Sequence, residues 1–261
     1  MDNTFVIETA KKIGIEKIGF CSAKKFKSEY KSVIAALFCY YSGDEEGANL
    51  SKYCYGLDYH KVVKNILEKL AKKLNLKEYE IFCDTGKNND RLIAYESGLG
   101  FFGLNSLLIC DEYGSFFFIG YIFCNENFEY SNPDTRECKK CGECIKKCPA
   151  NAILGDFKID VPKCLSEITQ KKGEHTEDEK NLIIQNNTVF GCDICQNVCP
   201  HNQNIEKTKF KEFSQNLVSK LDYDEIFSMS NKEFMNKYGN RAFSWRGKKV
   251  LERNLLYINE K

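Results

Sequence analysis

Eight of the fourteen cysteines lie between positions 138 and 199, and their spacing is suited to metal chemistry. Seven of them form two blocks, and Cys164 lies between these. Residues 138–149 have the spacing C-x2-C-x2-C-x3-C-P, and residues 192–200 have the spacing C-x2-C-x3-C-P. Thiolates are the soft ligands that iron–sulfur clusters select. The spacing therefore predicts an iron–sulfur protein that transfers single electrons.

The first block has the pattern in which three thiolates hold one [4Fe–4S] cluster and the fourth reaches a second cluster. Two clusters need eight thiolates, and the blocks supply seven. Cys164, between them, is the expected eighth, with a buried unligated thiol as the alternative. We therefore predict one cluster on Cys138, Cys141, Cys144 and Cys199, and a second on Cys148, Cys164, Cys192 and Cys195.

The remaining cysteines and one aspartate raise separate questions. Asp84 follows a predicted strand and precedes Thr85-Gly86, so it is either a general acid or a helix-cap or turn residue, and the spacing favours the cap or turn. Cys54 lies in a polar loop, where lining a site and having no role are both open. The other five cysteines are predicted to be buried in strands: Cys21, Cys39, Cys83, Cys110 and Cys124.

Composition narrows the class of protein. A net charge of +1 over 261 residues is that of neither a generally basic nor a generally acidic protein. The apolar run 116–123 is far shorter than a membrane helix, and the first residues lack a signal-peptide pattern. Fourteen cysteines without an export signal indicate metal ligation in a reducing compartment. We expect a cytoplasmic monomer without membrane segments.

Hydrophobic periodicity predicts the elements that must hold these residues. Helical spacing covers 5–13, 58–76 and 90–97, and strands are predicted at 17–22, 32–41 and 79–84. A hairpin is expected from 106–110 and 115–124. Residues 98–105 contain three glycines, which would let the backbone approach a bulky ligand. Short helices are predicted at 223–227 and 232–238.

The predicted fold class is α+β, in three regions. Residues 1–130 form an α/β domain with a mixed sheet flanked by helices, 131–202 a ferredoxin-like region with two clusters, and 203–261 a helical, basic segment. From Lys237 to Lys261 there are seven Lys or Arg and two Glu. This end is either a solvated helix face or a patch that contacts phosphates.

In this order, the motifs resemble those of the epoxyqueuosine reductases, cobalamin and iron–sulfur enzymes related to reductive dehalogenases. The matching stretches run through most of the chain: 55–62, 83–86, 96–106, 138–149, 164–166, 190–202 and 243–254. The resemblance implies reduction of the epoxide of epoxyqueuosine in tRNA. Electrons would come from a donor such as ferredoxin or flavodoxin and pass through both clusters to cobalamin.

The resemblance also assigns residues. Asp84 matches the proposed proton donor near the cobalt, which shifts the interpretation of this residue from cap to acid. The positions that match the lining of the cobalamin pocket are Cys54, Asn105, Ser166, Cys192 and Asp193.

Two departures from the family pattern leave alternatives open. Leu104 stands where family members carry lysine, and longer members continue beyond the equivalent of Lys261 into helical repeats that help hold the tRNA. The basic stretch 241–253 would then carry more of the phosphate contacts. A corrinoid iron–sulfur reductase with a small-molecule substrate and a ferredoxin-like electron carrier are the alternatives.

Overall fold

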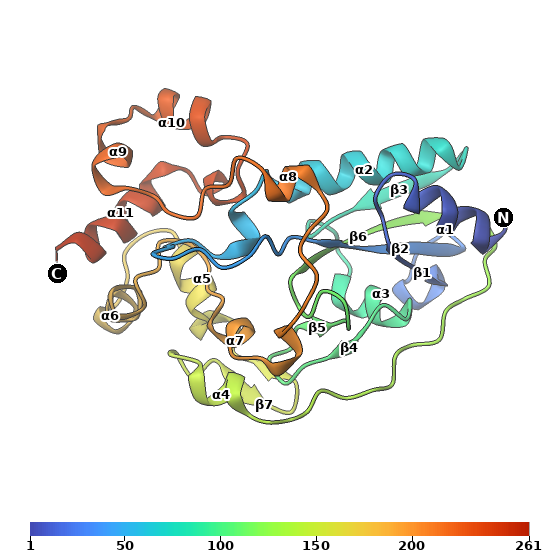
Figure 1. Ribbon diagram of the computed structural model, residues 1–261, viewed down its shortest axis with the longest axis horizontal. Helices are drawn as coiled ribbons and strands as arrows, with labels where there is room; N and C mark the ends of the chain where they lie inside the picture. Colours follow the sequence, from blue (N-terminus) through green and yellow to red (C-terminus); the bar gives the residue numbers. More distant parts are fainter. Residues whose placement is uncertain (261) are drawn as a thin grey trace.

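A four-stranded sheet forms the centre of the N-terminal half in the computed structural model, which describes residues 1–260 (Figure 1). Its strands are β1 (Lys17–Ser22), β2 (Ser32–Cys39), β6 (Phe117–Cys124) and β3 (Tyr79–Phe82), in that spatial order. Every pairing is antiparallel. The α+β class is confirmed, but the predicted mixed sheet is wrong. Alternation of helices and strands favours parallel crossovers, whereas here β6 inserts between β2 and β3 and runs opposite to both.

Both faces of this sheet are covered, which explains the continuous apolar run of β2. Ile34, Ala36 and Phe38 share a core with α1 (Asn3–Lys11) and α2 (Tyr59–Lys73). The alternate residues 33, 35 and 37 share a second core with α3 (Asp90–Glu96). Side chains alternate between faces along a strand, so a doubly covered strand is apolar at every position. The helices and strands predicted in this half are confirmed within a few residues.

Close packing of α2 on the sheet depends on one glycine. A Cβ at Gly120 of β6 would lie 2.4 Å from Val63 Cγ1 and 2.9 Å from Leu67 Cδ1. Any side chain there would push α2 off the sheet. Asp58 caps the start of this helix by accepting a hydrogen bond from the backbone N–H of His60 at 3.1 Å.

The predicted hairpin of 106–110 with 115–124 is wrong. Its two arms share only an isolated bridge between Cys110 and Gly114. Instead, β5 (Leu108–Ile109) pairs with β4 (Phe101–Phe102) in a separate two-stranded sheet. The second arm becomes β6, because its eight residues can be buried between β2 and β3.

A long segment without helices or strands leads from β6 to the cluster region along the lower edge of Figure 1. The cluster region holds short elements: α4 (Glu143–Lys147), β7 (Ile153–Gly155), β8 (Lys158–Ile159), α5 (Leu165–Gln170), α6 (Glu177–Asn186) and α7 (Ile194–Asn197). Helix α4 packs against α7, so the two cysteine blocks meet.

The C-terminal segment contains α8 (Lys211–Ser214), α9 (Tyr223–Ser228), α10 (Asn231–Tyr238) and α11 (Lys248–Asn259), and the two helices predicted there are confirmed. Phe213, Phe234 and Phe243 belong to the same hydrophobic core as α1 and α2. The boundaries at 130 and 202 stay a prediction, while the buried core spans the first and third regions. Within residues 1–260, no helix has both the length and the apolar character needed to cross a membrane.

Three of the seven basic residues at this end bind main-chain carbonyls of the fold. Arg241 donates hydrogen bonds to the carbonyls of Tyr55 and Asn216. Lys248 donates to the carbonyls of Ile226 and Met229. Arg253 likewise donates to the carbonyls of residues 171 and 173. These three cations thus pair with main-chain carbonyl oxygens. They form neither a solvated helix face nor a patch that contacts phosphates.

Candidate functional site

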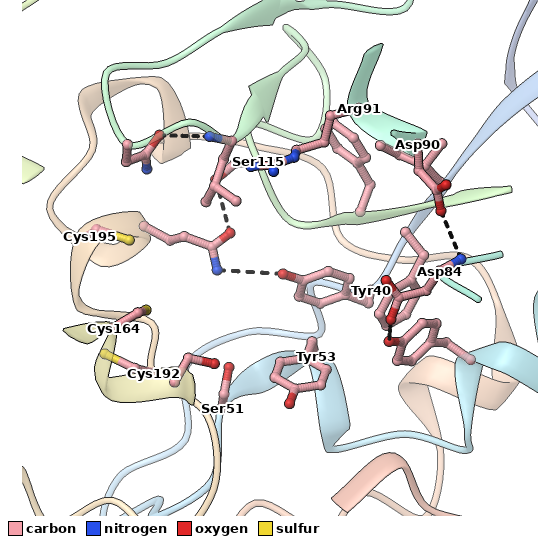
Figure 2. A pocket seen from close by; sticks show the side chains of 18 of the residues that line it. Tyr40, Ser51, Tyr53, Asp84, Asp90, Arg91, Ser115, Cys164, Cys192 and Cys195 are labelled. Atoms are coloured by element: carbon pink, nitrogen blue, oxygen red, sulfur yellow. Dashed lines mark hydrogen bonds between the residues drawn. The ribbon is translucent and has the colours of Figure 1, made fainter. Parts of the chain in front are cut away.

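The largest opening, here called the main cavity, has a volume of about 600 Å³ and lies between the sheet and the cluster region. Figure 2 shows Cys164, Cys192 and Cys195 along one wall and Asp84 with Asp90 on the opposite wall. The lining is largely aromatic and aliphatic, with polar groups interspersed: Tyr40, Tyr53, Tyr59, Phe117, Phe118, Ser51, Asn88, Asn105, Ser166 and Gln196. Its volume is within the range of cofactor-binding pockets.

The four cysteines predicted for the first cluster lie around one small opening. Its lining contains Cys138, Cys141, Cys144 and Cys199 together with the loop 103–105. Cys141 is exposed, whereas the other three are partly buried. Burial first, and then the neighbouring Cys199, raise the pKa of Cys144. Such a group of thiolates is stable only beside a compensating cation, which iron would supply.

The four cysteines predicted for the second cluster also lie together. Burial raises the pKa of Cys192 to about 12, and the nearby thiols of Cys164 and Cys148 add to that rise. Burial also raises the pKa of Cys195, with Cys192 and Cys164 as charged neighbours. Cys148 Sγ accepts a hydrogen bond from Ala152 N at 3.3 Å, as cluster-bound sulfurs commonly do.

The other five cysteines behave as buried apolar residues. All five are at most 3% exposed, as predicted: Cys21, Cys39, Cys83, Cys110 and Cys124. No three His, Cys, Asp or Glu side chains in the described part of the chain surround a position for a single metal ion. The four thiolates of a cubane cluster bind four different irons, so they are spaced more widely than the ligands of one ion.

Asp84 lies in a tight turn just after β3. Its backbone has φ +60°, an unusual conformation that aspartate tolerates better than most residues. Its N–H donates to Asp90 Oδ2 at 2.7 Å, and Asp90 also accepts from Tyr121 OH at 2.9 Å. Asn89, not Asp84, caps α3 by accepting from Leu92 N. The cap interpretation is therefore wrong, and the side chain of Asp84 is free to face the cavity.

Two neighbours from the start of α2 contact the carboxylate of Asp84. Tyr59 OH donates a short hydrogen bond to Asp84 Oδ2, and His60 Nε2 lies 3.5 Å from the same oxygen. His60 Nδ1 lies 2.8 Å from Asp58 Oδ1. The hydrogen bond with His60 lowers the pKa of Asp84, and Tyr59 lowers it further.

The same contacts act in reverse on the histidine. Burial alone would lower the pKa of His60, but hydrogen bonds with Asp58 and Asp84 outweigh it and raise the value to about 9. At neutral pH His60 is therefore protonated, and the Asp84 carboxylate beside it is ionised. Neither Tyr59 nor His60 was predicted from the sequence to belong to the site. The signal was present, since both lie in the matched stretch 55–62.

Three of the five residues predicted to line a cobalamin pocket lie in the main cavity: Asn105, Ser166 and Cys192. Asp193 lies behind the wall, where it accepts hydrogen bonds from Ser51 Oγ and Lys52 N. Cys54 is fully buried and donates to the carbonyl of Ser51 at 3.0 Å, so the structure does not bring it to the cavity.

Two glycines of 98–105 are required for the packing of the chain. A Cβ at Gly98, where φ is +70°, would lie 2.6 Å from the carbonyl oxygen of Asn132. A Cβ at Gly100 would lie 2.3 Å from that of Ile109. The predicted approach of this loop to a bulky ligand stays a prediction. Leu104 lies beside the first group of cysteines.

Further residues, whose role the sequence did not indicate, connect the wall of the main cavity to the cysteine blocks. Ser115 Oγ donates to Gln196 Oε1 at 3.0 Å, and Gln196 Nε2 lies 3.4 Å from Tyr40 OH (Figure 2). Asn202 Oδ1 accepts from Ser115 N at 2.7 Å. These residues carry no motif, and only the fold brings them together.

Comparison with known proteins identifies two segments. Residues 21–85 match a family model described as epoxyqueuosine reductase QueG, DUF1730. Residues 137–202 match a model described as a 4Fe-4S double cluster binding domain. The second match confirms the prediction of two [4Fe–4S] clusters.

Whole-chain relatives agree. The epoxyqueuosine reductase of Bacillus anthracis is 33% identical over 300 residues, covering 96% of this chain and 78% of that protein. The corresponding protein of Lactococcus garvieae is 37% identical over 214 residues, covering 80% of this chain and 60% of that protein. The chain thus spans between about three fifths and four fifths of these relatives.

Solved structures give the same assignment. A crystal structure of epoxyqueuosine reductase with an epoxyqueuosine-modified tRNA stem loop has a TM-score of 0.91 and 27% identity, over 98% of this chain and 80% of that one. A reductive dehalogenase shares the fold, with a TM-score of 0.54 and 15% identity over 80% of this chain and 32% of that one. The chain belongs to the epoxyqueuosine reductase family.

Proposed function

We propose that this protein is a cobalamin-dependent reductase that converts epoxyqueuosine to queuosine in tRNA. The observation that carries the proposal is the main cavity, which has cluster-ligand cysteines on one wall and Asp84 on the other. An electron source and a proton source thus face the same space. A simple electron carrier has no need of such a space.

The main cavity is suited to a corrin ring. Its aromatic and aliphatic lining would pack against the macrocycle, and polar residues such as Ser51, Asn105 and Ser166 would pair with its amide side chains. Two further openings share lining residues with it, which leaves room for a large cofactor. Bound cobalamin would supply a strongly nucleophilic, two-electron-reduced cobalt. Of the predicted contacts, Asp193 would act through Ser51, and Cys54 would have no direct contact.

The reaction consumes two electrons and two protons, and the epoxide oxygen leaves as water. Opening of the epoxide produces an alkoxide that needs a proton. We propose that Asp84 delivers this proton and that His60 stores it. Support comes from the raised pKa of His60, which keeps it protonated at neutral pH beside the ionised Asp84. Tyr59 would hold the carboxylate in place.

Electrons would enter at the first cluster, on Cys138, Cys141, Cys144 and Cys199, and leave from the second, on Cys148, Cys164, Cys192 and Cys195. The exposure of Cys141 supports this direction. A donor such as ferredoxin or flavodoxin would reach the exposed Lys139 and Lys140 beside it. We expect the protein to act as a cytoplasmic monomer, because its thiols must stay reduced and one chain supplies every site residue named here.

The test is direct. The protein, reconstituted anaerobically with iron, sulfide and cobalamin, is incubated with a reductant and tRNA that contains epoxyqueuosine. Nucleoside mass analysis should then detect queuosine, one oxygen lighter than its precursor. Absence of queuosine, with both clusters and cobalamin verified spectroscopically, would refute the proposed reaction. An Asp84→Asn variant is the control for turnover at this site.

A further inference from the structure

Trp245 is the only tryptophan of the sequence, and 58% of its side chain surface is exposed. It follows the 3-10 turn Ala242–Ser244, whose three residues are buried. Large aromatic side chains contribute most when they are buried, so an exposed indole on a buried turn marks a surface that binds something.

The surroundings of Trp245 connect it to the site. A second opening, here called the outer cavity, has a volume of about 500 Å³. It is lined by Trp245, Gln170, Ala242, Thr85, Tyr53, Tyr59, His60 and Asp84. Tyr53, Tyr59 and Asp84 line both the outer and the main cavity. A molecule that reaches Asp84 from outside through this opening therefore passes the indole.

The indole is held in one orientation. Its Nε1–H donates to Gln170 Oε1 at 3.1 Å, and Gln170 Nε2 donates to the carbonyl of Ser166 at 2.9 Å. The guanidinium of Arg246 lies over the ring, 3.7 Å from its centre. One face of the ring is thus covered by a cation, while the residue as a whole stays 58% exposed.

Arg246 differs from the other arginines of this segment. Arg241 and Arg253 donate their guanidinium hydrogens to main-chain carbonyls. The guanidinium of Arg246 instead lies over the indole of Trp245, and its Nε, like that of Arg241, has no hydrogen-bond partner among residues 1–260. An aromatic ring backed by a guanidinium is a combination that stacks on unstacked nucleobases.

We propose that Trp245 is a stacking platform for a nucleobase that neighbours the reacting nucleoside, with Arg246 as the cation behind the ring. The proposal rests on the proposed function, since it places single-stranded RNA at the opening that leads to Asp84. Stacking on a fixed ring would hold the neighbouring base aside while the reacting nucleoside enters the cavity. Trp245 is in this sense a positioning residue.

The single tryptophan provides a direct measurement. Holoenzyme is titrated with an anticodon stem-loop RNA that carries epoxyqueuosine, with tryptophan-selective excitation and correction for cofactor absorbance. Stacking should quench the fluorescence in a saturable manner. The titration is repeated with an abasic residue at each position next to the modified nucleoside. One abasic position should remove the quenching. Unchanged fluorescence on saturable RNA binding, or quenching by every abasic RNA, would overturn the proposal.

Variants give an independent measurement. Trp245→Ala should raise the dissociation constant for the stem-loop and KM about 5- to 150-fold, the range for loss of one stacked base, with little change in kcat. Trp245→Phe keeps a ring and should restore most of the affinity. Phe5→Ala, which removes a 49% exposed aromatic from α1, should change neither value.

Failure of this proposal is distinguishable from failure of the proposed function. If wild-type protein forms no queuosine, the proposed reaction fails, while the abasic titration still tests stacking. If wild-type protein forms queuosine and Trp245→Ala binds RNA with unchanged affinity and KM, the stacking platform fails alone. Intact cluster absorbance in each variant shows that the fold has been retained.

Discussion

The two groups of cluster cysteines differ in what they face. The first includes the exposed Cys141 and surrounds an opening of only about 20 Å³ near the surface. In the second group, three cysteines line the main cavity, which has a volume of about 600 Å³. Asn105 borders both openings and lies between the two groups. The first group therefore faces solvent and the second faces the main cavity, which supports the proposed direction of electron flow from the first cluster to the second.

Removing a ligand of the second cluster should reduce turnover more than removing a ligand of the first. In Cys164→Ala the second cluster loses a ligand, so iron content should fall by about half and turnover should vanish with every reductant. Iron analysis and nucleoside mass analysis measure both effects. Cys124→Ala, which changes a buried cysteine of β6, is the matched control and should keep iron and activity. Full iron in Cys164→Ala would remove this residue from the ligand set.

Proton delivery can be separated from electron delivery on the opposite wall. Asp84→Asn should lower turnover about 10²- to 10⁴-fold, because a general acid is lost, while both clusters and their reduction remain. Single-turnover assays with pre-reduced protein measure the effect. Asp111→Asn, at an exposed carboxylate that pairs with Arg136, should leave the rate unchanged. A wild-type rate in Asp84→Asn would show that another group protonates the product.

The first cluster should matter most when a protein donates the electrons. In Cys141→Ala, turnover driven by reduced flavodoxin or ferredoxin should fall severely, because the donor loses its entry cluster. Turnover driven by dithionite should fall less, since a small reductant needs no docking surface beside the first cluster and can reduce the second cluster directly. Parallel assays with both reductants check this. Equal losses would contradict the direction of flow inferred here.

The smallest expected effect concerns pH. Because His60 holds its proton more tightly in the folded chain, with a pKa of about 9 instead of 6.5, it stabilises the fold fully below about pH 6.5. This contribution is lost as the pH rises through about 9. Turnover should fall over the same upper range as the stored proton is lost. Denaturation and rate profiles of His60→Gln should lack this step; an unchanged profile would exclude His60 as its source.

Much of the chemistry is predictable from local sequence. The spacing of 138–149 and 192–200 is enough to predict two clusters, because each block spans only a few turns of chain. The helix over α2 and its cap at Asp58 follow equally from neighbouring residues. Caps, turns and metal-binding blocks depend on contacts between residues close in sequence.

The rest depends on packing between distant segments. The order of β6 and β3, the contact of Tyr59 and His60 with Asp84, and the burial of Cys54 have no local signal. The same holds for Trp245, which only the fold brings to the opening at Asp84. Sequence by itself thus determined which cofactor chemistry is present. Tertiary structure decided which group of cysteines faces solvent and which side chains surround Asp84, because burial and long-range contacts arise only when the whole core forms.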